Sequence, residues 1–240
     1  MLLAVALGGC HRHADGSAHG STAREFPRAA RQVATVVSTE WSTEAERDNH
    51  KEAQTVMDLA RVGPGSSVAD IGAGEGYYTV RLGARVGPKG RVLAEDIDGA
   101  AMKRLGARVE RERLDNVSIV TGAADDPRLP ASSFERVFLI HMYHEVSEPY
   151  AFLWRMRPAL RSGGRIVVVD LDRATLAHGT PPDLLACEFE SVGYRVVQFV
   201  RKPEIAGYYA EFAPAGVRPA PSQIRPCLIR NGRVVRGPAA

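Results

Sequence analysis

The sequence has 240 residues, with 31 Lys and Arg against 28 Asp and Glu, so its formal net charge is +3. This length suits one α/β domain with a large core and short extensions. A charge so close to balance does not favour nucleic acid as a partner, and we expect none. The cysteines, Cys10, Cys187 and Cys227, are too few for a disulfide framework and lack zinc-ligand spacing. We therefore expect no metal site, and buried free thiols at Cys187 and Cys227, which could pair if the domain is exported.

The first 22 residues predict a signal and a flexible linker. Residues 1–10 are apolar and end in Leu7-Gly8-Gly9-Cys10, which is similar to a bacterial lipobox, whose Cys is lipidated. The apolar run is short and no Lys or Arg precedes it, so a plain apolar N-terminus stays open as the alternative. Localisation is left open between a lipid anchor at Cys10 and the cytoplasm. Residues 11–22 have the His, Gly, Ser and Ala content of a linker.

The next segment, residues 23–62, predicts a helical cap. Thr43 and Glu46 form a capping box, and Ala53, Val56 and Met57 fall on one helical face. We expect one helix over residues 44–61.

From residue 63 onward, short apolar runs alternate with amphipathic helical patterns. Strands are expected at residues 67–71, 91–95, 117–121, 136–141, 165–170, 194–200 and 227–230, and helices at residues 75–86, 99–113, 148–160 and 183–192. Residues 63–240 are therefore expected to form one catalytic domain, with a Pro- and Gly-rich extension from about residue 202. The alternation predicts a doubly wound α/β fold with a mostly parallel, seven-stranded Rossmann-like sheet and helices on both faces.

The first strand-to-helix turn, residues 70–76, is the expected cofactor site, because doubly wound sheets bind ligands outside the carboxyl ends of their strands. Gly72 and Gly74 let the backbone bend and approach a ligand. Dinucleotide enzymes use Gly-x-Gly-x-x-Gly at this place, whereas Gly76 follows Gly74 by only two residues. Glu75 would repel a pyrophosphate but not a cation. The turn therefore favours a zwitterionic sulfonium cofactor over a dinucleotide.

The run Asp70-Ile-Gly-Ala-Gly-Glu-Gly76 resembles motif I of class I S-adenosylmethionine-dependent methyltransferases, and the resemblance extends over about residues 66–200. It implies that the motif I acid and the glycine backbone hold the methionyl part of S-adenosylmethionine. It also implies that Asp96, at the end of the second strand, accepts the ribose hydroxyls, with Glu95 as the rival. Relatives often carry Gly-Asp-Ala after the third strand, where this chain has Gly-Ala-Ala-Asp, so Asp125 is assigned to the adenine. The full expected cofactor set is Asp70, Gly72, Ala73, Gly74, Gly76, Asp96, Ile97, Ala124 and Asp125.

The fourth strand leads into His141-Met-Tyr143-His144-Glu145, at the rim where a methyl group would be transferred. We predict His141, Tyr143, His144 and Glu145 as catalytic, because such groups orient a nucleophile or accept its proton. The alternative is that His141 is structural and that only His144 and Glu145 face the substrate. The His-x-x-His-Glu order does not indicate a metal here, because these residues leave a strand into a turn and share no helical face.

The sequence thus predicts an S-adenosylmethionine-dependent methyltransferase acting on a small-molecule acceptor, most similar in kind to the ubiquinone/menaquinone methyltransferases. Two alternatives stay open. One is a nicotinamide-dependent Rossmann oxidoreductase, and the other is a non-catalytic S-adenosylmethionine-binding envelope protein. The acceptor and the oligomeric state are also left open.

Overall fold

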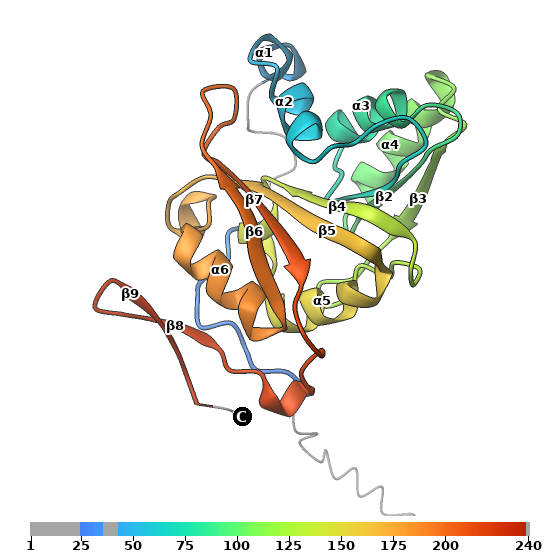
Figure 1. Cartoon of the computed structure of the whole chain (residues 1–240). Helices are drawn as coiled ribbons and strands as arrows, with labels where there is room; N and C mark the ends of the chain where they lie inside the picture. Colours follow the sequence, from blue (N-terminus) through green and yellow to red (C-terminus); the bar gives the residue numbers. More distant parts are fainter. Residues whose placement is uncertain (1–24, 36–42, 239–240) are drawn as a thin grey trace, which may run out of the picture.

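A seven-stranded sheet forms the centre of the computed structural model, which describes residues 25–35 and 43–238 (Figure 1). The strand order is β3-β2-β1-β4-β5-β7-β6, and all strands run parallel except β7. The strands are β1 Ser67–Ile71, β2 Arg91–Asp96, β3 Val117–Thr121, β4 Phe134–Ile140, β5 Leu160–Asp170, β6 Tyr194–Val200 and β7 Tyr208–Pro214. The predicted doubly wound, mostly parallel α/β fold is confirmed.

Helices cover both faces of the sheet, with α3 and α4 on one side and α5 and α6 on the other (Figure 1). Their bounds are α3 Tyr77–Val86, α4 Gly99–Arg111, α5 Pro149–Met156 and α6 Pro182–Ser191. The described residues also form four short 3₁₀ helices: η1 Tyr143–Glu145, η2 Arg157–Ala159, η3 Thr175–Ala177 and η4 Pro221–Gln223. No helix in the described ranges is long and apolar enough to cross a membrane.

The core follows from the alternation of side chains along the central strands. Val68 packs with residues of α2 and α3, whereas Ala69 and Ile71 pack with residues of α5 and α6. In β5, residues 166–169 are all fully buried, as expected for a parallel strand that is covered on both faces. Because β1 to β5 run parallel in this packed sheet, their carboxyl ends lie along the same edge.

The N-terminal cap differs from the single helix expected over residues 44–61. The capping box of Thr43 and Glu46 is present, but the helix is divided into α1 Glu44–Asn49 and α2 Glu52–Leu59. The break falls at Lys51, whose φ of 57° is left-handed and interrupts the helical path. Residues 25–35 contain no helix or strand, so within the described part of the cap the helices begin at Glu44. Cys10 and the predicted linker lie outside the described residues.

The seventh strand of the sheet is β7, and the sequence prediction for this strand was wrong. The predicted strand at residues 227–230 does form, as β8 Cys227–Arg230, but it pairs with β9 Arg233–Arg236 in a separate two-stranded sheet. Strand β7 lies in a Pro- and Gly-rich region and contains the buried Glu211, which interrupts its apolar pattern. Arg136 and Arg165 each lie 3.5 Å from the Glu211 carboxylate and supply the opposite charge that it needs there.

Cys187 and Cys227 form a disulfide that joins α6 to β8, with their Cα atoms 6.1 Å apart. The expectation of free thiols was therefore wrong. The two residues are 40 positions apart, and they meet because the chain returns along α6 after β7. No local sequence pattern carries that information.

Candidate active site

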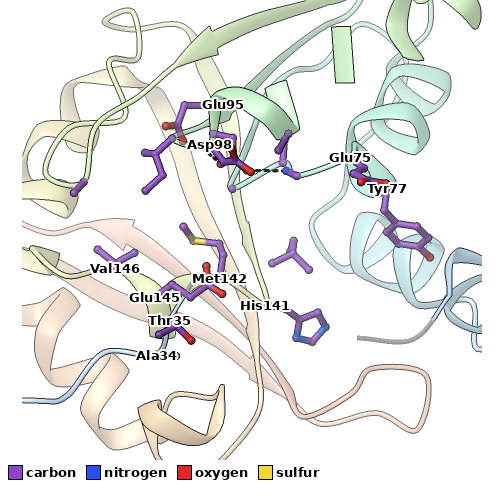
Figure 2. Close-up of a pocket in the computed structure, with 18 of the residues that line it drawn as sticks. Ala34, Thr35, Glu75, Tyr77, Glu95, Asp98, His141, Met142, Glu145 and Val146 are labelled. Carbon is purple, nitrogen blue, oxygen red and sulfur yellow. Dashed lines mark hydrogen bonds between the residues drawn. The ribbon is translucent and has the colours of Figure 1, made fainter. Parts of the chain in front are cut away.

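A cavity of about 590 Å³ opens at the carboxyl ends of β1, β2 and β4. This volume is in the usual range for a small-molecule site. Residues 72–75, 95–98, 101 and 123–124 form one side, the glycine half; residues 33–35, 140–142, 145–147 and 152 form the other, the rim half. In Figure 2, Glu95 and Asp98 lie across the cavity from Ala34, Thr35 and Glu145, with Met142 between them. The two halves therefore face one another over a shared space.

The glycine turn is shaped by its left-handed residues. Gly72 has a φ of 66°, and a Cβ on it would lie 2.9 Å from Cγ of Met142. Gly74 has a φ of 54°, and a Cβ placed there would meet nothing within 4 Å. Met142 can pack directly on the turn because Gly72 has no side chain, while the backbone at Gly74 stays open to a ligand.

Asp96 is fixed beside the turn by two backbone amides. The Gly74 N–H donates to Oδ2 and the Asp98 N–H donates to Oδ1, each at 2.8 Å. Each carboxylate oxygen keeps a further acceptor position, and Asp96 lines the cavity together with Ile97. The structure thus brings Asp96, Ile97 and the glycine turn together, as the sequence predicts.

Glu95, the rival acid, is 2% exposed but also lines the cavity. Its Oε1 fits against Gly122, where a Cβ would lie only 1.6 Å away. Burial, and then the charge of Asp96, raises the pKa of Glu95 to about 8. At neutral pH Glu95 is therefore mainly a neutral carboxyl group that can donate a hydrogen bond.

Two predicted cofactor residues, Asp70 and Asp125, form hydrogen bonds with neighbouring side chains and do not line the cavity. Asp70 is buried between β1 and α3, where the Thr79 hydroxyl donates to its carboxylate at 2.6 Å, and burial raises the pKa of Asp70 to about 6. Asp125 accepts hydrogen bonds from Arg155 at its carboxylate and at its backbone oxygen. Neither residue belongs to the cavity wall described above, whereas Ala124 does. Asp70 therefore supports the turn from inside the domain, and the adenine contact expected of Asp125 stays a prediction.

On the rim half, His141 faces the cavity and is backed by a buried carboxylate. Its Nε2 lies 3.5 Å from Oε1 of Glu52. Arg47 and the Tyr78 hydroxyl also donate to that oxygen, at 2.6 and 2.9 Å. Burial opposes ionisation of Glu52, yet the hydrogen bonds and charges of His141 and Arg47 lower its pKa to about 2. An ionised Glu52 thus orients His141. The sequence analysis did not predict this role of Glu52. The signal that could have indicated it is an acid placed directly before the apolar face of α2.

Tyr143 and His144 face the core instead of the cavity. The Tyr143 hydroxyl donates to Glu188 at 2.8 Å, and burial raises the pKa of Tyr143 well above its usual value, so it is not a base. Nδ1 of His144 lies 3.1 Å from Asp170. A 3₁₀ turn directs successive side chains about 120° apart, so η1 presents only Glu145 to the cavity. His141 and Glu145 are therefore the predicted catalytic residues that the structure places on the rim.

Arg31, in the N-terminal segment, binds the turn that carries Glu145. Arg31 is 9% exposed and donates to Glu188 at 2.9 Å. Its other nitrogens donate to the backbone oxygens of Tyr143, His144 and Val146. One buried arginine thus satisfies three carbonyls of the η1 turn and fixes the place of Glu145.

The cavity is rich in negative charge. Among the described residues, six acidic side chains line it against a single arginine, Arg47, and five of the six carry charge at neutral pH because the Glu95 carboxyl is mainly neutral. The acids are Glu44, Glu75, Glu95, Asp96, Asp98 and Glu145. Such a wall attracts a cationic ligand and repels a pyrophosphate.

Residues 68–164 match the sequence profile of the family described as methyltransferase domain. This match identifies residues 68–164 as a methyltransferase domain, and its fold and glycine turn resemble those of the class I S-adenosylmethionine-dependent methyltransferases.

Two curated relatives are similar to the chain. It is 31% identical over 121 residues to the ubiquinone/menaquinone biosynthesis C-methyltransferase of Hahella chejuensis, which covers 50% of this chain and 48% of the relative. It is 26% identical over 120 residues to the demethylmenaquinone methyltransferase of Listeria welshimeri, with 50% and 51% covered. The chain therefore spans about half the length of these relatives.

A solved structure of an S-adenosylmethionine-dependent methyltransferase from Aquifex aeolicus has a TM-score of 0.61 and 19% sequence identity to this chain. The likeness covers 72% of this chain and 97% of that one. At this low sequence identity, the likeness shows a shared fold.

Proposed function

We propose that the protein transfers a methyl group from S-adenosylmethionine to a small-molecule acceptor in the cavity between the glycine half and the rim half. One observation carries the proposal. The glycine turn and the fixed Asp96 carboxylate form one wall of the same cavity whose opposite wall holds His141 and Glu145.

The glycine half fits the cofactor. The open backbone at Gly74 leaves room for the methionyl part, and Asp96 has oxygens oriented for two ribose hydroxyls. Ile97, which is 48% exposed, offers an apolar surface for the adenine. The acidic wall suits a ligand with a sulfonium and an ammonium group.

The rim half supplies alignment and a proton acceptor. S-adenosylmethionine carries an activated methyl group, so most of the rate comes from placing the acceptor in line with it and excluding water. Met142 packs on Gly72 and separates the two halves beside the turn. In its neutral form, His141, oriented by Glu52, takes a proton from an acceptor that must lose one.

The acceptor is proposed to be small and partly apolar. Met142, Val146 and Phe152 line the rim half beside the polar His141 and Glu145. The names of the two curated relatives suggest demethylated quinols as the first compounds to test. Since those alignments cover about half of this chain, they support the cofactor half more strongly than the choice of acceptor.

The nicotinamide alternative is not supported by the topology. Dinucleotide folds use the strand order 3-2-1-4-5-6, whereas here the antiparallel β7 lies between β5 and β6. A protein that binds the cofactor without catalysis stays the second candidate, and turnover distinguishes it.

The test begins with isothermal titration of S-adenosylhomocysteine, the product of the reaction. We expect binding at one site, and no binding of NADH. Asp96→Ala removes two hydrogen bonds to a charged group, about 3 kcal/mol or more, and should weaken binding at least ~100-fold. Wild-type protein that binds NADH but not S-adenosylhomocysteine would contradict the proposal. Transfer of labelled methyl groups to a panel of quinols, phenols and amines then separates catalysis from binding alone.

Separately, we propose that the domain faces an oxidising compartment. The Cys187–Cys227 disulfide supports this, because such bonds persist outside reducing cytosol. The lipobox-like Leu7-Gly8-Gly9-Cys10 agrees with export. Cys10→Ser should move the protein from the membrane fraction to the soluble fraction, and an unchanged distribution would contradict a lipid anchor at this cysteine.

A further inference from the structure

Directly behind the rim, three potential metal ligands converge from two separate segments. His144 and Glu145 belong to η1, and His178 follows η3, which is more than thirty residues further along the chain. Each offers one ligand atom, and these atoms lie within 4.8 Å of one another. The sequence could not show this cluster, because the His-x-x-His-Glu run contains only two of its members.

The His144 side chain is prepared to act as a ligand. It is 1% exposed, and its Nδ1 lies 3.1 and 3.2 Å from the two oxygens of Asp170. A carboxylate oxygen accepts, so Nδ1 carries the hydrogen and Nε2 keeps its lone pair. Among the described residues, Nε2 has no hydrogen-bond partner. A buried acceptor without a partner is costly, and a bound cation would satisfy it.

Asp170 is itself held in place. Its oxygens accept hydrogen bonds from the Thr180 hydroxyl and the Leu171 N–H, both at 2.8 Å. A carboxylate that orients the far nitrogen of a ligating imidazole is the usual outer partner of a metal-bound histidine. The Asp170–His144 pair has this arrangement.

The spacing of the cluster suits a small divalent ion. Bonds of about 2.0–2.1 Å in a tetrahedral site place ligand atoms ~3.3 Å apart. His144 Nε2 and Glu145 Oε1 are 3.9 Å apart, and the widest separation in the cluster is below 4.8 Å. Rotation of the partly exposed Glu145 and His178 side chains covers the remaining difference, which is at most ~1.5 Å.

We propose that His144, Glu145 and His178 form a binding site for one divalent transition-metal ion, with zinc as the best match. Two imidazoles and one carboxylate make up a known three-ligand set for zinc that leaves a further position open. Because Glu145 also lines the cavity, the ion would lie in the wall of the rim half. The open position would take water or an oxygen of the acceptor.

The test uses the full chain, freed of metal with a chelator and titrated calorimetrically with Zn²⁺ alone. We expect one tight site. His178→Gln and Glu145→Gln each remove one ligand and should weaken binding at least ~10-fold. Asp170→Asn removes the outer partner of His144 and should weaken it about 10–100-fold. The measurement needs no methyl donor, so its outcome is independent of the proposed methyl transfer.

Two matched controls identify the site. His50→Gln changes an exposed histidine outside the cluster and should leave the affinity unchanged. The triple variant His11→Ala, His13→Ala, His19→Ala removes the N-terminal histidines, which are the rival chelating group, and should also leave it unchanged.

Binding that survives His178→Gln but disappears in the triple variant would overturn the proposal, and so would wild-type protein that binds no Zn²⁺. A second readout needs no variant. Co²⁺ added to wild-type protein should give the visible absorption of a four-coordinate site with nitrogen ligands, and a spectrum of hydrated Co²⁺ alone would count against the site. Circular dichroism confirms that His178→Gln, which changes a half-buried loop residue, remains folded.

Discussion

Replacement of Glu52 by Gln should destabilise the protein strongly at neutral pH, because one buried carboxylate holds Arg47, Tyr78 and His141 together. Its pKa falls from 4.5 in the reference state to about 2 in the folded protein. At 1.36 kcal/mol per pKa unit, the ionised form stabilises the fold by about 3 kcal/mol. Loss of one partner from a buried ion pair gives a similar figure, about 3–5 kcal/mol. We therefore expect Glu52→Gln to lose about 3 kcal/mol at pH 7.

The pH dependence has a definite sign. The folded pKa of Glu52 is depressed, so its stabilising contribution is complete above about pH 5 and is lost as the pH falls towards 2. Glutamine does not titrate. The difference between wild type and Glu52→Gln should therefore shrink to less than half at pH 3.

Urea unfolding at pH 7 and pH 3 measures both quantities. Glu135→Gln is the matched control, because Glu135 pairs with Arg161 at 3.2 Å on the surface and should change stability by less than ~1 kcal/mol. The reasoning is refuted if Glu52→Gln is as stable as this control at pH 7, or if its deficit is the same at both pH values.

Three further perturbations should have measurable effects. The raised pKa of Glu95 means that wild-type stability falls as the pH rises from about 4.5 to 8, and Glu95→Gln should remove this part of the pH profile in thermal unfolding. Reduction of the Cys187–Cys227 disulfide, which closes a 40-residue loop, should cost about 4 kcal/mol in urea unfolding, and thiol titration before reduction should detect neither cysteine. Arg31→Ala leaves Glu188 buried without its cation and should cost about 3–5 kcal/mol, with a lower kcat/KM because the η1 turn loses its anchor.

Sequence reasoning succeeded where local periodicity decides the structure. Strands β3 and β6 have the predicted bounds, because their apolar runs end at turn-forming residues. It failed for β7, where Glu211 is buried only because Arg136 and Arg165, from two other strands, lie beside it. A single sequence does not reveal such long-range charge pairs.

In the candidate site, too, features set by the local sequence were predicted and features set by long-range contacts were not. The glycine turn was predicted from a spacing that reflects a local backbone requirement, whereas Asp96 was predicted from the resemblance to the methyltransferase family. The roles of the rim residues depend on partners far along the chain. Glu52 contacts His141 on the rim, and Asp170 forms a hydrogen bond with His144 in the core. The sequence left open that His141 is structural and that only His144 and Glu145 face the substrate. The structure contradicts this alternative, because His141 lines the cavity and His144 is buried beside Asp170.

A crystal structure of the protein with S-adenosylhomocysteine tests the central claim most directly. The account predicts the homocysteine part on the backbone of Gly72 and Gly74, both ribose hydroxyls on Asp96, and the sulfur facing Met142 and His141. A ligand bound outside this cavity, or a ribose that makes no contact with Asp96, would contradict it.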